Sequence, residues 1–227
     1  MRILEKKAIA IDGPSGAGKS TLARALAAKL GYLYVDTGAI YRTVGLAAKR
    51  AGIGLDNAAA VIELLPGLDI DLGYGEDGIQ RMYLAGEDVS AAIREPEISM
   101  YASAVSALPE VRAFLMEQQR SLARTHCVIM DGRDIGTVVL PDADLKIFLT
   151  AAPEARAGRR WKELKAKGID EPYEKVLSEI VERDRNDITR AAAPLRQAGD
   201  AVAVDTTKYD LEESLELLLG LVKEKLG

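Results

Sequence analysis

A glycine-rich stretch, GPSGAGKSTL, occupies residues 13–22 and separates the apolar run AIAID from a run with helical spacing. The apolar run is typical of a strand that is buried on both faces. In the following run, Leu22, Leu26 and Leu30 recur at helical spacing until Gly31 ends the pattern. The order strand, glycine-rich loop, helix therefore predicts an α/β fold in which the loop follows a buried strand.

The residue types of this loop are those that bind an anion. Glycine leaves no side chain in the way of a ligand, and Gly13, Gly18 and Lys19 have the spacing of a phosphate-binding loop before a helix N-terminus. We expect Lys19 to reach the outer phosphates, and the hydroxyl of Ser20, with Thr21 beside it, to ligate Mg²⁺. The predicted triphosphate site comprises Gly13, Pro14, Ser15, Gly16, Ala17, Gly18, Lys19, Ser20 and Thr21. The alternative is a glycine-rich turn without a ligand.

Four further apolar runs, YLYVD, CVIMD, LKIFL and AVAVD, alternate with longer helical patterns. They predict a sheet of five parallel strands, and ligands of such sheets bind beyond the carboxyl ends of the strands. Four of the five runs end in an aspartate: Asp12, Asp36, Asp131 and Asp205. Each alone is equally well explained as a turn or cap residue, so only Asp36 and Asp131, which stand beside other informative residues, are candidates for the site.

Residues 68–90 change the pattern to short alternating segments, LDIDL and IQRMYLAG, with expected turns at Gly73, Gly75 and Gly78. This pattern predicts a small antiparallel sheet inserted into the parallel fold. The insert is either a surface flap without chemistry or the part that holds a second substrate.

Composition limits the classes of protein that remain. A chain of 227 residues, 48% hydrophobic, fits one sizeable α/β domain with a small insert. The net charge of −5 argues against a nucleic-acid binder, which needs a basic face. The single cysteine, Cys127, suits a reducing cytoplasm and is expected in the core. Neither a signal peptide nor a membrane span is recognisable, so we predict a cytoplasmic protein that binds a small anion.

The segment MDGRDIGTVV at residues 130–139 places Arg133 and Asp134 just beyond a predicted buried strand. A turn explains Asp131 and Gly132, but two adjacent opposite charges at such a position are costly unless a ligand or partner uses them. A carboxylate and a guanidinium match the exocyclic amine and the acceptors of a cytosine ring by hydrogen-bond type. The segment is therefore compatible with recognition of cytosine.

Residues 153–194 carry six arginines on helical patterns: Arg156, Arg159, Arg160, Arg183, Arg185 and Arg190. Mixed charge of this kind often belongs to a solvated helix face. Phosphoryl transfer, however, needs cations near the transferring group and the exclusion of water, and a mobile lid with arginines supplies both. We interpret this region as such a lid.

These residues together resemble the bacterial cytidylate kinases of the nucleoside monophosphate kinase group. The motifs GPSGAGKST, DTGAIYR, GEDVS and DGRDIGTVVLPDA, followed by ERD and APL, occur in the family's order over nearly the whole chain. The resemblance implies a three-layer phosphate-loop kinase fold with a five-stranded parallel sheet, a small antiparallel insert and a helical lid. It further implies a single kinase domain over residues 1–227, with a monophosphate-binding region at 37–108, the insert near 68–90 and the lid at 153–172.

The resemblance also implies an activity, namely transfer of the γ-phosphoryl group of ATP to CMP or dCMP with Mg²⁺, by a monomer. The implied acceptor contacts are Thr37, Arg42, Arg133 and Arg190 for the phosphate, Ser103, Arg112 and Asp134 for cytosine, and Arg183 and Asp187 for the pentose. The implied catalytic groups are Lys19, Arg133 and the lid residues Arg156 and Arg160, which stabilise charge during the transfer.

Two other functions are compatible with the phosphate loop. One is a kinase for a different small acceptor, against which the MDGRD segment and the insert argue. The other is a regulatory protein that binds ATP and transfers nothing to CMP. Direct nucleic-acid binding is weaker still, because only 5% of the residues are aromatic and could stack on bases.

Overall fold

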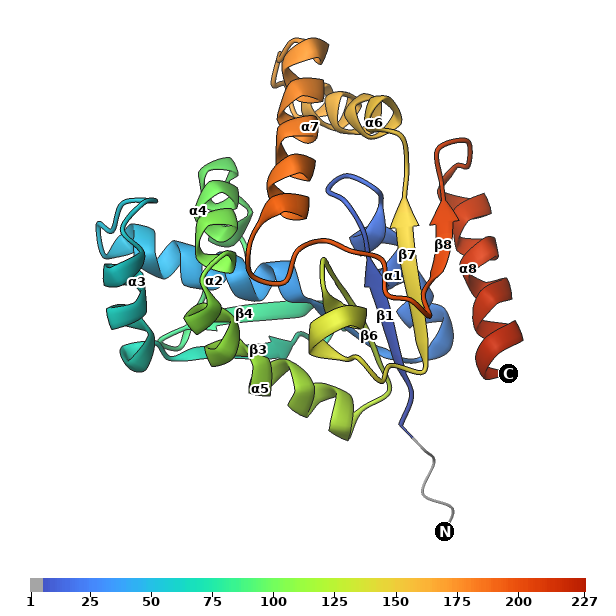
Figure 1. Ribbon diagram of the computed structural model, residues 1–227, viewed down its shortest axis with the longest axis horizontal. Coiled ribbons are helices and arrows are strands. Elements are labelled where there is room, and N and C mark those ends of the chain that lie inside the picture. Colours follow the sequence, from blue (N-terminus) through green and yellow to red (C-terminus); the bar gives the residue numbers. More distant parts are fainter. Residues whose placement is uncertain (1–5) are drawn as a thin grey trace. The chain divides into compact units, whose positions relative to one another are not determined.

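The computed structural model describes residues 6–227, which divide into two compact units. The first unit contains residues 6–34 and 123–227, and the second contains residues 35–122. Figure 1 shows the elements of both units.

The main sheet contains all five predicted strands. Its order is β2 (Leu33–Asp36), β6 (Val128–Gly132), β1 (Ala8–Asp12), β7 (Leu145–Thr150) and β8 (Val202–Asp205). The central strand β1 pairs in parallel with β6, Ala8 opposite Val128, and with β7, Ile9 opposite Leu145. The prediction of a five-stranded parallel sheet is confirmed.

The helices of the first unit are α1 (Lys19–Leu30), the π-helix η3 (Ile135–Val139), α6 (Pro153–Ala166), α7 (Tyr173–Thr189) and α8 (Leu211–Leu226). Side chains of α1 and α8 pack against the sheet, where Ile11 of β1, Leu26 of α1 and Leu218 of α8 are fully buried in one core. Helix α1 ends at Gly31, whose φ of 67° closes the helix as the sequence predicts. This core holds the carboxyl end of β1, and hence the start of the glycine-rich loop.

Helices α6 and α7 form a pair with an apolar cluster of their own. Ala157, Val176 and Ile180 are its buried members, and the ring of Trp161 contacts that of Tyr173 edge to face with centroids 6.3 Å apart. Figure 1 shows the pair beyond the carboxyl end of β7. Helices therefore occur where a helical lid is predicted, and movement of the pair stays a prediction.

The second unit contains the predicted antiparallel insert. Its strands are β3 (Ile70–Tyr74), β4 (Gln80–Leu84) and β5 (Glu87–Asp88), and its helices are α2 (Thr37–Arg50), α3 (Ala58–Leu64), η1 (Leu65–Gly67), η2 (Ala92–Arg94), α4 (Pro96–Ser106) and α5 (Pro109–Thr125). One expected turn was wrong, because Gly73 lies inside β3. A Cβ there would come 3.2 Å from the ring of Tyr83 on the neighbouring strand, so Gly73 makes room for an aromatic ring.

Two further expectations concern the burial of Cys127 and the presence of a membrane span. Cys127 is only partly buried, which corrects the prediction of a core cysteine, and its Sγ accepts a long hydrogen bond from the backbone N–H of Lys7 at 3.5 Å. Within residues 6–227, every helix is too short or too polar to span a bilayer.

Candidate functional site

The glycine-rich loop depends on glycines at defined positions. Gly13, Gly16 and Gly18 have φ values of +148°, +75° and +88°, a region that other residues rarely adopt. A Cβ on Gly13 would lie 1.9 Å from the carbonyl oxygen of Leu149 in β7. The loop therefore starts in direct contact with the carboxyl end of β7, and only glycine fits there.

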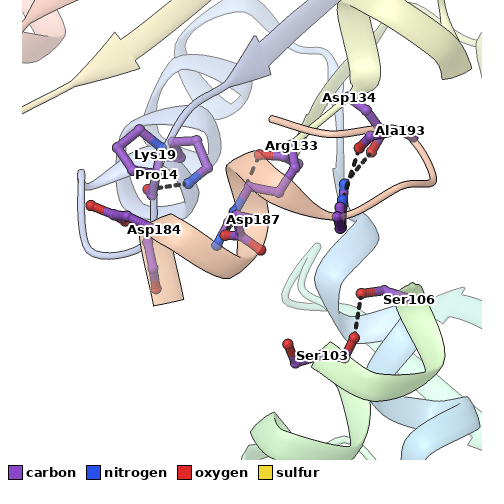
Figure 2. Close-up of polar contacts among 12 residues, drawn as sticks. Pro14, Lys19, Ser103, Ser106, Arg133, Asp134, Asp184, Asp187 and Ala193 are labelled. Atoms are coloured by element: carbon purple, nitrogen blue, oxygen red, sulfur yellow. Dashed lines mark hydrogen bonds and ion pairs between the residues drawn. The ribbon is translucent and has the colours of Figure 1, made fainter. Parts of the chain in front are cut away.

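Lys19 is buried within this loop. Its Nζ donates a hydrogen bond to the carbonyl oxygen of Pro14 at 2.7 Å, as Figure 2 shows. Burial lowers the pKa of Lys19 well below its usual value, and the nearby charge of Arg133 lowers it further. A phosphate anion beside Nζ would favour the charged form, so the loop is arranged to gain from binding an anion.

Ser20, the predicted magnesium ligand, lies beside the candidate Asp131. The Ser20 Oγ donates to Asp131 Oδ2 and the Tyr34 hydroxyl donates to Asp131 Oδ1, both at 2.8 Å. A hydroxyl and a carboxylate supply the hard oxygen atoms that suit Mg²⁺, which takes few protein ligands and several from water or phosphate. Within residues 6–227, no cluster of three acidic, His or Cys side chains that could hold a metal ion is present. Thr21 is exposed, and its predicted role stays a prediction.

Arg133 and Asp134 do not pair with each other. Arg133 Nε donates to Asp187 Oδ2 at 2.6 Å (Figure 2). Asp134 Oδ1 lies 3.5 Å from Arg190 Nη2. Burial raises the pKa of Asp187, but Arg133, Arg183 and Arg190 outweigh burial and lower the pKa below its usual value. The structure thus brings together the five predicted acceptor residues of the first unit, Arg133, Asp134, Arg183, Asp187 and Arg190. Partners within the chain account for the adjacent charges of Arg133 and Asp134.

The two predicted lid arginines differ in environment. Arg156 is 2% exposed and donates to the carbonyl oxygen of Ser15, at 2.9 Å, and to both carboxylate oxygens of Asp184. Arg160 is exposed and lies 3.3 Å from Glu163 of the same helix. Arg156 is therefore built into the loop's surroundings, whereas Arg160 faces solvent.

Asp12, at the end of β1, holds the π-helix η3. Its two carboxylate oxygens accept hydrogen bonds from the backbone N–H groups of Ile135, at 2.8 Å, and Gly136, at 2.7 Å. Burial raises the pKa of Asp12 from its usual value near 3.8 to about 6, although these two bonds oppose the shift. The strand that leads into the loop is thereby connected to the segment that follows Arg133 and Asp134.

The raised pKa of Asp12 predicts a pH-dependent stability difference between the native chain and Asp12→Asn. As the pH rises from 4, the unfolded chain loses the proton first, so the free energy of unfolding falls until folded Asp12 ionises near pH 6. The shift from 3.8 to about 6, at about 1.4 kcal/mol per pKa unit, corresponds to about 3 kcal/mol in all, and we expect the native-minus-variant difference to decrease by about 2.5 kcal/mol of this between pH 4 and 7. Urea unfolding over this pH range measures it, and a difference that increases with pH would contradict the raised pKa.

In the second unit, the N-terminus of α2 gathers polar groups. Asp36 caps the helix by accepting from the backbone N–H of Ala39 at 2.9 Å, and Arg94 Nη2 lies 2.8 Å from its other carboxylate oxygen. Burial raises the pKa of Asp36, but the charges of Arg94 and Arg42 outweigh it and lower the pKa. Thr37, the first residue of α2, is buried. Thr37 thus lies at the helix N-terminus, which favours an anion, and Arg42 of the second turn acts on Asp36 beside it.

Ser103 and Arg112 are linked through Ser106. The Ser106 Oγ donates to the carbonyl oxygen of Ser103 at 3.0 Å (Figure 2), and Arg112 Nη1 donates to the carbonyl oxygen of Ser106 at 3.2 Å. The guanidinium of Arg112 lies over the ring of Tyr41, 5.6 Å from its centroid. Two of the three residues predicted to recognise cytosine, Ser103 and Arg112, therefore share one polar connection, and the third, Asp134, lies in the first unit.

Sequence reasoning missed three residues of these networks. Asp184, Arg94 and Tyr34 bind partners that lie 28, 58 and 97 positions away in the chain. Asp184 belongs to the motif ERD, yet only its placement beside Arg156 distinguishes it from the other acidic residues of α7. Pairings over such separations leave no local pattern.

Comparisons with known proteins address the family. The model of the cytidylate kinase family matches residues 9–224. A cytidylate kinase from Caldicellulosiruptor bescii is 52% identical over 218 residues, 96% of either chain, and one from Geobacter sp. strain M21 is 51% identical over 220 residues, 96% of this chain and 94% of its relative. The chain belongs to the cytidylate kinase family.

The fold of this cytidylate kinase family member also resembles a solved structure. A crystal structure of an uncharacterized protein from Eubacterium ventriosum has a TM-score of 0.52 at 13% identity, covering 97% of this chain and 99% of that chain. At such low identity the likeness concerns the fold alone. The predicted α/β fold class, a five-stranded parallel sheet with helices and a small antiparallel sheet, is confirmed.

Proposed function

We propose that this nucleoside monophosphate kinase transfers the γ-phosphoryl group of ATP to CMP or dCMP, giving ADP and CDP or dCDP. The observation that carries the proposal is the buried ammonium of Lys19 inside a loop whose glycines adopt positive φ values before α1. Membership of the cytidylate kinase family supports the choice of acceptor.

The donor side of the proposal rests on the first unit. The backbone N–H groups of Gly13 and of residues 15–18, together with the N-terminus of α1, surround the phosphates of ATP, and Lys19 neutralises their outer charge. Ser20 and Asp131 are the residues that would hold Mg²⁺, which neutralises phosphate charge when bound. Arg156 and the more exposed Arg160 stabilise the charge that develops on the transferring group.

The acceptor side keeps the roles that follow from the motifs. The residues that bind the acceptor phosphate are Thr37, Arg42, Arg133 and Arg190. Those that bind cytosine are Ser103, Arg112 and Asp134, and those that bind the pentose are Arg183 and Asp187. These roles are supported by the proximity of three arginines, Arg133, Arg183 and Arg190, to Asp187 in the first unit. In the second unit they are supported by the effect of Arg42 on Asp36, the residue before Thr37. We propose residues 37–108 as the monophosphate-binding region, with the insert near 68–90, and residues 153–172 as the lid of a single kinase domain.

The mechanism needs no covalent enzyme intermediate. An oxygen of the acceptor phosphate forms the new bond to the γ-phosphorus, and the bond to the bridging oxygen breaks with its electron pair remaining on ADP. Side chains therefore act by positioning and by charge neutralisation. Arg42, Arg133 and Arg190 offset the repulsion between the two anionic substrates. We propose a cytoplasmic monomer whose partners are these substrates, without nucleic acid or membrane.

A coupled ADP-release assay tests the proposal. With Mg-ATP, we expect rapid turnover with CMP and dCMP, and turnover lower by about 100-fold or more with AMP and GMP, because a pocket built to hydrogen-bond one base leaves polar groups unpaired against another. UMP and a reaction without acceptor complete the comparison. ADP release at one slow rate with or without acceptors would instead favour a regulatory ATP-binding protein.

A further inference from the structure

We propose that Asp184 of α7 is a positioning residue for phosphoryl transfer, which holds Arg156 against the phosphate loop. The proposal rests on the proposed kinase function, in which Arg156 stabilises the transferring phosphoryl group. Asp184 itself is not expected to touch either substrate.

The contact between the two residues has the geometry of a fixed pair. Arg156 Nη1 lies 2.9 Å from Asp184 Oδ1 and Nη2 lies 2.5 Å from Oδ2, so the carboxylate binds the planar guanidinium at two points. The side chains are 3% and 17% exposed. Arg156 Nε also donates to the carbonyl oxygen of Ala151 at 2.8 Å. The orientation of the guanidinium is therefore determined from two sides, and solvent competes little for it.

Arg156 passes this constraint on to the loop. Its Nη1 donates to the carbonyl oxygen of Ser15 at 2.9 Å, and a Cβ on Gly16 would lie 3.4 Å from the Cβ of Arg156. The peptide unit is planar and trans, so its C=O and N–H point in opposite directions. A Ser15 carbonyl held toward Arg156 therefore fixes the direction of the Gly16 N–H, one of the donors assigned to the phosphates.

The same turn of α7 also reaches the acceptor residues of the first unit. Asp187 follows Asp184 by three positions, a spacing that places both side chains on neighbouring parts of the helix surface, and Asp187 binds Arg133 at 2.6 Å. Figure 2 shows Asp184 and Asp187 on this helix with Arg133 against Asp187. One turn of α7 thus holds an arginine of the donor side and an arginine of the acceptor side.

The first experiment separates kcat from KM in Asp184→Asn. We expect kcat to fall by about 30–100-fold, because a small displacement of a charge-stabilising group is enough for such a loss. KM for ATP should rise several-fold and KM for CMP should change by less than about threefold. Asp184→Glu keeps the charge and should recover part of kcat. The matched control is Glu182→Gln on the same helix, where both members of the pair with Arg185 are exposed, and kcat should change by less than about twofold.

A double-mutant cycle decides between positioning and a merely structural role. If Asp184 acts through Arg156, Asp184→Asn should lower kcat by less than about twofold in an Arg156→Met background. In Asp184→Asn alone, the buried guanidinium of Arg156 loses its counter-ion, whereas in the double variant the guanidinium is absent too. The double variant can therefore be assayed even where Asp184→Asn alone folds poorly. Fluorescence of Trp161, the single tryptophan of the chain, gives the unfolding midpoint of each variant.

The outcomes separate the two levels of the proposal. If the native chain is active, two results overturn the positioning role alone. One is an unchanged kcat in Asp184→Asn, and the other is a loss of kcat from Asp184→Asn that is just as large in the Arg156→Met background. An unchanged kcat in Arg156→Met overturns it as well, because Asp184 then has nothing to position. A native chain that does not phosphorylate CMP overturns the proposed function, and the positioning role with it.

Discussion

Replacement of Lys19 by alanine is expected to lower kcat for CMP phosphorylation by about 10²–10³-fold, with little change in the thermal unfolding transition. The expected loss is that of a charged group directed at the developing charge in a water-poor site. Stability should be maintained because the buried ammonium has a lowered pKa, which shows that the folded state does not favour its charge. Its hydrogen bond to the Pro14 carbonyl orders the loop rather than the core.

The coupled ADP-release assay and a thermal melt measure these two properties. Lys29→Ala is the matched control, since Lys29 is an exposed lysine in the last turn of the same helix. Its kcat should stay within about twofold of the native value, because a remote surface charge acts through screened interactions. Near-normal turnover of Lys19→Ala, together with an unchanged melting transition, would remove Lys19 from the catalytic residues.

Replacement of Gly13 by alanine is expected to lower the free energy of unfolding by about 4 kcal/mol. The added Cβ would stand 1.9 Å from the carbonyl oxygen of Leu149, whose position the parallel sheet fixes. Overpacking costs about 1–3 kcal/mol, and a φ of +148° in a residue with a side chain adds about 1–3 kcal/mol. Relief of the clash requires the loop to move away from β7, so binding of ATP should weaken too.

Urea unfolding, followed by the fluorescence of Trp161, measures the effect. Gly220→Ala in α8 is the control, because a Cβ there would meet no atom from other parts of residues 6–227 within 4 Å. That variant should gain about 0.5–1 kcal/mol, the usual benefit of alanine over glycine inside a helix. A loss below about 1 kcal/mol in Gly13→Ala would show that the loop can shift at low cost.

Patterns within short windows predicted most of the fold. The five apolar runs became the five strands, and Gly31 closed α1, because strand burial and helix termination depend on neighbours a few positions away. The same reasoning is wrong at Gly73, for which it predicts a turn. Because Gly73 has no side chain, it leaves room for the ring of Tyr83 on the next strand. The local sequence gives no sign of this contact.

The candidate site divides in the same way. The phosphate loop is contiguous, so residues 13–19 could be recognised from spacing alone, and the family's motifs pointed to the other candidates. Only the tertiary structure shows that Arg133 pairs with Asp187 instead of its neighbour Asp134, and that Asp184 holds Arg156. Ion pairs and hydrogen bonds act over a few ångströms of space, whereas the sequence orders residues along the chain. The phosphate-binding residues of one contiguous loop could therefore be predicted from the sequence. The contacts between residues of distant segments could be found only in the tertiary structure.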